Sequence, residues 1–233
     1  YFTLVSEFML QQTQVKTVIP YFNNFLKNIP NLQSLAKVSE TKLLKHWQGL
    51  GYYSRAKNLK KSAKMIIGNY NGRLPDNFEE LKKLPGVGDY TASAISAITF
   101  NRQIIPLDGN IERVLKRVLS LKTEEEIKKE NLHKQKKFFG KTSRSSDYAQ
   151  ALMELGALLC KPKNPYCDKC PITKHCLSFK KKDFKIKKKE KKTIDKFYLA
   201  TLYKNDDHLL LIKNEKFKFL KNLLIFPMKE ITQ

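Results

Sequence analysis

Residues 84–110 read LPGVGDYTASAISAITFNRQIIPLDGN, in which a Gly-x-Gly turn leads into a helical pattern and a short loop then ends at Asp108. Gly86 and Gly88 allow the backbone to turn sharply and to come close to a ligand. N–H groups are exposed where the helix begins, and an anion such as a phosphate can bind there. The pattern predicts a turn that grips a phosphate, with Asp108 facing the reacting group and a second helix behind it.

The chain is long and strongly basic. It has 233 residues, with 45 Lys and Arg against 22 Asp and Glu, so that 45 − 22 gives a net charge of +23. The length is enough for one large domain or two smaller ones. The charge indicates a nucleic acid or an anionic surface as partner. Neither a membrane-spanning apolar run nor a signal peptide is seen, so we expect a cytoplasmic protein without a membrane partner. The chain begins at Tyr1 rather than Met, and we expect N-terminal sequence to be missing.

The first three quarters of the chain have the apolar spacing of short helices. We expect side chains to cap helices at Ser39, at Asp76 with Glu79, and at Thr123 with Glu126. The ranges with helical spacing are 15–26, 39–47, 55–67, 89–99, 111–119 and 148–160. This part of the chain is therefore expected to be mainly α.

The composition changes near residue 180. Residues 180–192 hold nine lysines and few apolar residues, which is typical of a solvated linker. The pattern then becomes that of strands, with ranges 197–203 and 209–213 on either side of a hairpin signal at 205–208. Some forty residues are too few for a stable domain. We interpret them as the opening of a domain that contains β-structure.

Four cysteines lie close together, with the spacing Cys160-x6-Cys167-x2-Cys170-x5-Cys176. Four thiolates at this density suit a tetrahedral zinc ion or an iron–sulfur cluster. A disulfide framework is less compatible with the expected compartment. The alternative is that the four are incidental, and the spacing of one C-x2-C pair does not choose between the two metals.

The 6-2-5 cysteine spacing resembles the [4Fe-4S] loop of the endonuclease III superfamily of DNA glycosylases. LPGVG is similar to the hairpin of that superfamily's helix-hairpin-helix, and Asp108 in PLDGN to its catalytic aspartate. The resemblance implies a mainly α, two-lobed helix-hairpin-helix glycosylase with an iron–sulfur loop. It also implies DNA contacts from the hairpin, the segment after Asp108 and the cysteine loop, namely Leu84, Gly86, Val87, Gly88, Asn110, Lys161 and Lys163.

Tyr90 bears on the branch of the superfamily. Bifunctional members carry a catalytic lysine eighteen residues before the aspartate, and here 108 − 18 is 90. Tyrosine has no amine with which to form a Schiff base to the opened sugar. We therefore expect a monofunctional glycosylase without efficient lyase activity, in which Tyr90 forms a hydrogen bond near Asp108.

Two further segments resemble A/G-specific adenine glycosylases of the MutY type. SEFMLQQTQV (residues 6–15) is similar to their SE-x-MLQQTQV signature, and GLGYYSRAKNL (residues 49–59) to their GLGYYxRAxNL segment. The likeness implies that Glu7 is the general acid for adenine and that Tyr52 inserts beside 8-oxoguanine. It further implies DNA contacts from the wedge and the tyrosine segment, namely Gln11, Gln12, Thr13 and Arg55. Phe226-Pro227 resembles the start of the family's Nudix-like α/β domain, here cut short.

The resemblance implies four parts: a six-helix domain (1–103), a helical cluster domain (104–179), a linker (180–194) and a partial Nudix-like domain (195–233). It implies a monomeric enzyme of the bacterial cytoplasm and nucleoid that excises adenine opposite 8-oxoguanine or guanine in duplex DNA. Base flipping, protonation by Glu7 and a carboxylate at Asp108 would carry the reaction.

Blander alternatives stay open for each residue. Asp108 could be a plain helix cap, Glu7 a solvated helix residue and Tyr52 a packing residue. For the whole chain, a mismatch thymine or uracil glycosylase of the same superfamily is the nearest rival. A non-catalytic DNA-binding module is the rival from another class.

Overall fold

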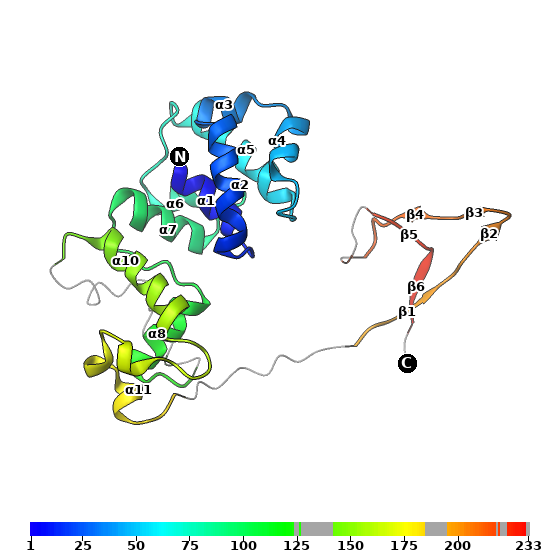
Figure 1. Cartoon of the computed structure of the whole chain (residues 1–233). Coiled ribbons are helices and arrows are strands. Elements are labelled where there is room, and N and C mark those ends of the chain that lie inside the picture. The colour runs from blue at the N-terminus through cyan, green and yellow to red at the C-terminus, as the bar shows by residue number, and fades with distance from the viewer. Residues whose placement is uncertain (124–125, 127–141, 185–194, 218, 220–222, 232–233) are drawn as a thin grey trace. The chain divides into compact units, whose positions relative to one another are not determined.

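The computed structural model describes residues 1–123, 126, 142–184, 195–217, 219 and 223–231 (Figure 1). The chain divides into two compact units, Tyr1–Lys187 and Lys188–Gln233. Much of the lysine-rich run falls outside the described residues, so its interpretation as a linker stays a prediction. In the described parts of the chain, no helix is both long and apolar enough to cross a membrane.

The first unit is built from helices, as the apolar spacing predicted. In chain order these are α1 (Phe2–Leu10), α2 (Val15–Asn28), α3 (Leu32–Lys37), α4 (Glu40–Trp47), α5 (Ser54–Asn69), α6 (Phe78–Lys82), α7 (Asp89–Phe100), α8 (Gly109–Leu119), α10 (Ser145–Glu154), the π-helix η3 (Leu155–Leu159), the 3₁₀ turns η4 (Cys167–Lys169) and η5 (Thr173–His175), and α11 (Leu177–Lys180).

Two apolar clusters hold this unit together. The first surrounds α1, which packs against α2, α5 and α7 and buries Phe8 completely. The second joins α8 to α10 and η3 through Ile111, Leu152 and Leu155. Burial of each large apolar side chain contributes about 1.5–3 kcal/mol to folding. The boundary expected at 103/104 lies between the clusters, but both belong to one compact unit, and the division into domains stays a prediction.

Most expected helix caps are present. The Ser39 side chain accepts a hydrogen bond from the N–H of Lys42 at the start of α4. Thr123 and Glu126 form the reciprocal bonds of a capping box, and the helix predicted beyond them lies outside the described residues, so it stays a prediction.

The cap predicted at Asp76 is wrong by one residue. Asn77 is the N-cap of α6 and accepts from the N–H groups of Glu79 and Glu80. Asp76 instead forms an ion pair with Arg102 at 2.5 Å. Asn and Asp cap helices about equally well, so residue type alone could not choose between these two neighbours.

The second unit contains short antiparallel strands. β1 (Phe197–Ala200) pairs with β6 (Met228–Ile231), β2 (Lys204–Asn205) with β3 (His208–Leu209), and β4 (Ile212–Lys213) with β5 (Leu224–Ile225). The hairpin expected at 205–208 is confirmed, with Asp206 in the left-handed region (φ 47°). The strand expected at 197–203 is shorter than predicted. The assignment of residues 195–233 to a partial Nudix-like domain stays a prediction.

Candidate active site and cysteine loop

Glu7 is a buried carboxylic acid. It lies on α1, whose sequence FTLVSEFML is apolar on nearly every side, and its side chain is 5% exposed. Burial, and secondly the nearby carboxylate of Asp108, raise the pKa of Glu7 to about 7. Its Oε2 has no hydrogen-bond partner among the described residues. A carboxyl in this setting can carry a proton near neutral pH and donate it.

Asp108 is the N-cap of α8. Its Oδ1 accepts from the N–H groups of Asn110 (3.0 Å) and Ile111 (2.7 Å), and its Oδ2 accepts from the Asn110 side-chain amide (3.1 Å). The partial positive charge at a helix N-terminus favours an anion there. The capping role weighed from the sequence is therefore real, and it holds the carboxylate in a defined place.

Tyr90 is the third residue of the candidate active site, beside Glu7 and Asp108. It lies in the first turn of α7 and is half-buried. Burial is the main cause that raises the pKa of its hydroxyl, and the charges of Glu7 and Asp108 raise it further. The three side chains, from α1, α7 and α8, thus share one electrostatic environment. Two groups with raised pKa values, Glu7 and Tyr90, gathered in this way are typical of a functional site.

The Gly-x-Gly turn is tightly packed from behind. Gly86 has φ +83°, and a Cβ there would come within 2.8 Å of Phe8 Cε1 and 2.9 Å of Asn58 Cβ. Gly88 is the N-cap of α7 and adds no side chain over the first turn of N–H groups. The side chains of Leu84 and Val87 are buried, at 1% and 7% exposure. These two residues can therefore offer a ligand their backbone but not their side chains, and their predicted contact with DNA stays a prediction.

Two loops beside this turn carry residues with strained backbones. Gln12, between α1 and α2, has φ +57°, and Tyr52, before α5, has φ +46°. Both side chains are exposed, Tyr52 at 62%. Gln11 Nε2 donates to the carbonyl of Gly86 (3.1 Å) and to Thr91 Oγ1 (3.4 Å), which ties the first loop to the Gly-x-Gly turn. Thr13 Oγ1 donates to the Gln11 carbonyl at 3.4 Å.

Arg55 does not lie where a phosphate could reach it. Its side chain is 6% exposed, and its guanidinium donates to backbone carbonyls of both loops and of α1. The expectation that Arg55 contacts DNA directly is therefore wrong. Nη1 and Nη2 are bound to carbonyls inside the protein, and Nε is buried without a hydrogen-bond partner among the described residues, so none of these donors faces a phosphate in solvent.

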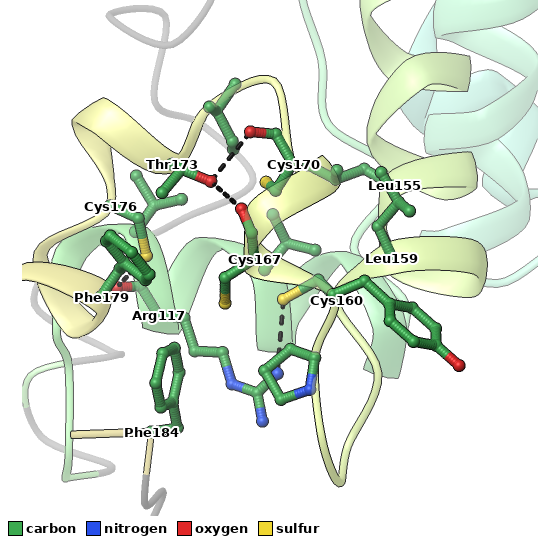
Figure 2. A pocket seen from close by; sticks show the side chains of 15 residues that line it. Arg117, Leu155, Leu159, Cys160, Cys167, Cys170, Thr173, Cys176, Phe179 and Phe184 are labelled. Carbon is green, nitrogen blue, oxygen red and sulfur yellow. Dashed lines mark hydrogen bonds between the residues drawn. The ribbon is translucent and has the colours of Figure 1, made fainter. Parts of the chain in front are cut away.

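The four cysteines line one cavity together with apolar side chains of α8, η3 and α11 (Figure 2). Burial and the other three thiols raise the pKa of Cys167. Thr173 Oγ1 donates to the carbonyls of Cys167 (2.5 Å) and Cys170 (2.8 Å) and holds the loop in shape. Over the described residues, no group of three or more possible ligands is arranged around a single metal ion. As a donor set, four thiols facing one cavity fit a thiolate-bound inorganic group.

Lys161 and Lys163 lie on the loop between Cys160 and Cys167, and both are exposed. The Lys161 ammonium lies over the ring of Tyr166, 5.0 Å from its centroid. Both lysines can therefore be reached from solvent by a phosphate.

Comparison with known proteins places this arrangement in a family. The sequence profile of the HhH-GPD superfamily base excision DNA repair proteins matches residues 5–137. The chain belongs to this superfamily. The matched residues include Glu7, the Gly-x-Gly turn, Tyr90 and Asp108.

Named relatives and solved structures agree with this membership. The adenine DNA glycosylase of Buchnera aphidicola subsp. Schizaphis graminum is 38% identical over 229 residues, covering 96% of this chain and 66% of that protein. The chain thus spans about two thirds of that relative's length. A solved thermostable thymine-DNA glycosylase aligns with TM-score 0.67 and 27% identity, over 78% of this chain and 84% of that one. A non-covalent endonuclease III–DNA complex aligns with TM-score 0.62 and 25% identity, over 77% and 84%.

Sequence reasoning missed two residues of this HhH-GPD site. Arg113 donates to Asn110 Oδ1 (2.9 Å), to the Gly156 carbonyl (2.7 Å) and to the Cys160 carbonyl (2.8 Å). Gly156 packs so closely on α8 that a Cβ would come within 2.9 Å of Asn110 Cβ. The spacing of Asn110 and Arg113 on one helix face was a signal for the first. No local pattern points to the second.

Proposed function

We propose that the chain is a monofunctional adenine DNA glycosylase that removes adenine mispaired with 8-oxoguanine or guanine. The observation that carries the proposal is the buried Glu7, with a pKa of about 7, beside the carboxylate of Asp108. Further support comes from the relative named adenine DNA glycosylase, which matches 96% of this chain. A superfamily fold alone would not identify the base.

The reaction needs an acid and an anion with separate roles. Adenine first leaves the base stack, which costs a few kcal/mol. The Glu7 carboxyl then donates its proton to a ring nitrogen, so the base departs neutral as the C1′–N9 bond breaks. The Asp108 carboxylate stabilises the positive charge that develops on the sugar. Water adds to that sugar, loses a proton and leaves an abasic site. We assign to Tyr90 a hydrogen bond at the sugar beside Asp108.

Tyr90 also underlies the proposed absence of lyase activity. A lyase reaction on this scaffold needs an amine that attacks the opened sugar. Position 90 supplies a phenol, whose pKa is raised further by burial. The strand should therefore remain unbroken after adenine leaves.

We further propose that Cys160, Cys167, Cys170 and Cys176 hold a [4Fe-4S] cluster. Their 6-2-5 spacing and their shared cavity support this. When bound, the cluster would cross-link the loop by iron–thiolate bonds. The loop then presents Lys161 and Lys163 to the DNA backbone. Iron and acid-labile sulfide in the purified protein would support the cluster, whereas stoichiometric zinc would overturn it.

The DNA partner is proposed to be a duplex bound by one copy of the protein. The Gly-x-Gly turn would grip a phosphate with its backbone, and Gln12 and Tyr52 would enter the duplex at the mispair. The setting we propose is the bacterial cytoplasm, at the nucleoid, because the relative that matches 96% of the chain is bacterial.

A mismatch thymine glycosylase is the second candidate, favoured by the structural alignment to a thermostable thymine-DNA glycosylase. It would not need a buried acid for adenine at Glu7. Single-turnover release of adenine opposite 8-oxoguanine, compared with that of thymine opposite guanine, separates the two. Faster thymine release would overturn our proposal.

Asp108→Asn tests the assignment of the carboxylate. The amide can still accept the capping hydrogen bonds, so we expect a folded protein that binds the mispair about as tightly as wild type. Adenine release should fall by at least about a hundredfold, the effect of losing a main electrostatic stabiliser. Asp76→Asn, at an exposed carboxylate paired with Arg102, is the matched control and should keep wild-type activity. Wild-type release by Asp108→Asn would contradict the mechanism.

A further inference from the structure

We propose that Arg55 is a positioning residue that fixes the distance between the two loops that enter the DNA. These are the wedge loop (residues 11–13) and the tyrosine loop (residues 49–52). The inference rests on the proposed function, because it concerns how adenine is brought out of the stack. It gives a role to a side chain that cannot touch the DNA itself.

One guanidinium joins both loops. Arg55 Nη1 donates to the carbonyls of Phe8 (3.2 Å), Met9 (2.7 Å) and Gln11 (2.5 Å), at the end of α1 and the start of the wedge loop. Nη2 donates to the carbonyls of Leu50 (3.0 Å) and Gly51 (3.2 Å) in the tyrosine loop. The two sets of carbonyls lie about forty residues apart in sequence, so the side chain acts as a cross-link.

The aromatic residues around Arg55 reinforce the junction. Its guanidinium carbon lies 5.5 Å from the ring centroids of both Trp47 and Tyr52. Trp47 Nε1 donates to the Gly51 carbonyl at 3.2 Å, so the tyrosine loop is held from a second direction. Trp47 is fully buried, which makes this anchor rigid.

Each loop contains one residue with a strained backbone, which contacts from neighbouring residues must stabilise. Gln12 and Tyr52 have positive φ angles of 57° and 46°, which residues other than glycine rarely adopt. Such conformations persist when the surrounding structure determines them, and they gather at functional sites. Arg55 supplies that determination at the residues next to both, through Gln11 and Gly51.

Lysine could not do this. Guanidinium has five donors in a planar fork, whereas an ammonium is a point charge with three. An Arg55→Lys side chain keeps the charge but loses the two separate terminal nitrogens, of which one bonds to each set of carbonyls. The loops would then move relative to each other, and an error of about 1 Å in such positioning can cost a hundredfold in rate.

The test uses the full chain with Arg55→Lys, and with Arg73→Lys at an exposed arginine as the matched control. The duplex carries 2′-fluoro-2′-deoxyadenosine opposite 8-oxoguanine, because fluorine slows cleavage, and 2-aminopurine as the neighbouring base. Fluorescence of 2-aminopurine rises when the stack opens, and anisotropy shows when the protein is saturating. A second duplex with ordinary adenine measures single-turnover release.

We expect wild type and Arg73→Lys to give the full fluorescence rise. Arg55→Lys should give less than half of it at saturation and release adenine about 10- to 100-fold more slowly. Equal fluorescence and equal release by Arg55→Lys would overturn the inference. So would a wild-type complex with no rise, because the loops would then not open the stack.

Arg55→Lys could fail to fold, which circular dichroism would show. Trp47→Phe then decides, because it keeps a buried ring but loses the bond to the Gly51 carbonyl. It should show a smaller loss of fluorescence in the same direction, and wild-type fluorescence would overturn the inference. If wild type opens the stack but releases no adenine, the proposed function fails while the comparison still tests Arg55.

Discussion

Glu7 is the side chain whose protonation should control the rate. Burial and the Asp108 charge raise its pKa to about 7, and only the protonated form can donate a proton to adenine. That form is present below the pKa and is lost as the pH rises through it. We expect single-turnover adenine release at saturating protein to fall as the pH rises above about 7, by up to tenfold per unit.

Glu7→Gln should abolish this fall in rate with rising pH, and it should slow adenine release at every pH, because the amide has no acidic proton to give. Glu154→Gln, at the exposed end of α10, is the control and should keep the wild-type profile. A wild-type rate that stays level up to pH 9 would rule out Glu7 as the acid.

Between elements, η3 packs closely against the first turn of α8 at Gly156. A Cβ on Gly156 would lie 2.9 Å from Asn110 Cβ and 3.1 Å from its carbonyl oxygen. Gly156→Ala must therefore push α8, and Asp108 with it. We expect a loss of about 1–3 kcal/mol in the free energy of unfolding, as for overpacking, and adenine release slowed at least about tenfold.

Gly68→Ala is the matched change in α5, where an added Cβ would meet nothing within 4 Å. It should raise the free energy of unfolding by about 0.5–1 kcal/mol and leave release unchanged. Chemical denaturation and the single-turnover assay measure both effects. If Gly156→Ala behaved like Gly68→Ala, the tight contact would not position the aspartate.

Local sequence patterns predicted the helices and strands better than they predicted the contacts between these elements. The apolar spacing of α2 and the serine cap of α4 are short-range features, and both are present. Asn77 rather than Asp76 caps α6, and Asp76 pairs instead with Arg102, a long-range contact that no local pattern predicts. Likewise β1 pairs with β6, about thirty residues away, rather than with its neighbour in sequence.

The residues of the candidate site could be predicted from local sequence, whereas the contacts between them could not. Glu7, Tyr90 and Asp108 could be named from motifs because their chemistry is written in residue type and spacing. Their shared electrostatic environment needed the packing of α1, α7 and α8. The burial of Arg55 could not be read from its motif, since the carbonyls it binds come from two distant loops.

The charge of the whole molecule predicts how it binds DNA. A net charge of +23 implies many phosphate contacts, each of which releases counterions. We expect the affinity for an undamaged duplex to fall on the order of a thousandfold between 50 and 200 mM salt, as for about six or more contacts. A fluorescence-anisotropy titration over that range measures the slope. A flat log–log plot would contradict this account of non-specific binding.

Adenine release without strand cleavage is the central claim for the molecule as a whole. The most direct test is single-turnover reaction of iron-loaded protein with a duplex that holds one adenine opposite 8-oxoguanine, analysed with and without hot alkali. The proposed roles of Glu7, Tyr90 and Asp108 predict strand breaks at the adenine only after alkali. Breaks without alkali, or no release of adenine at all, would contradict them.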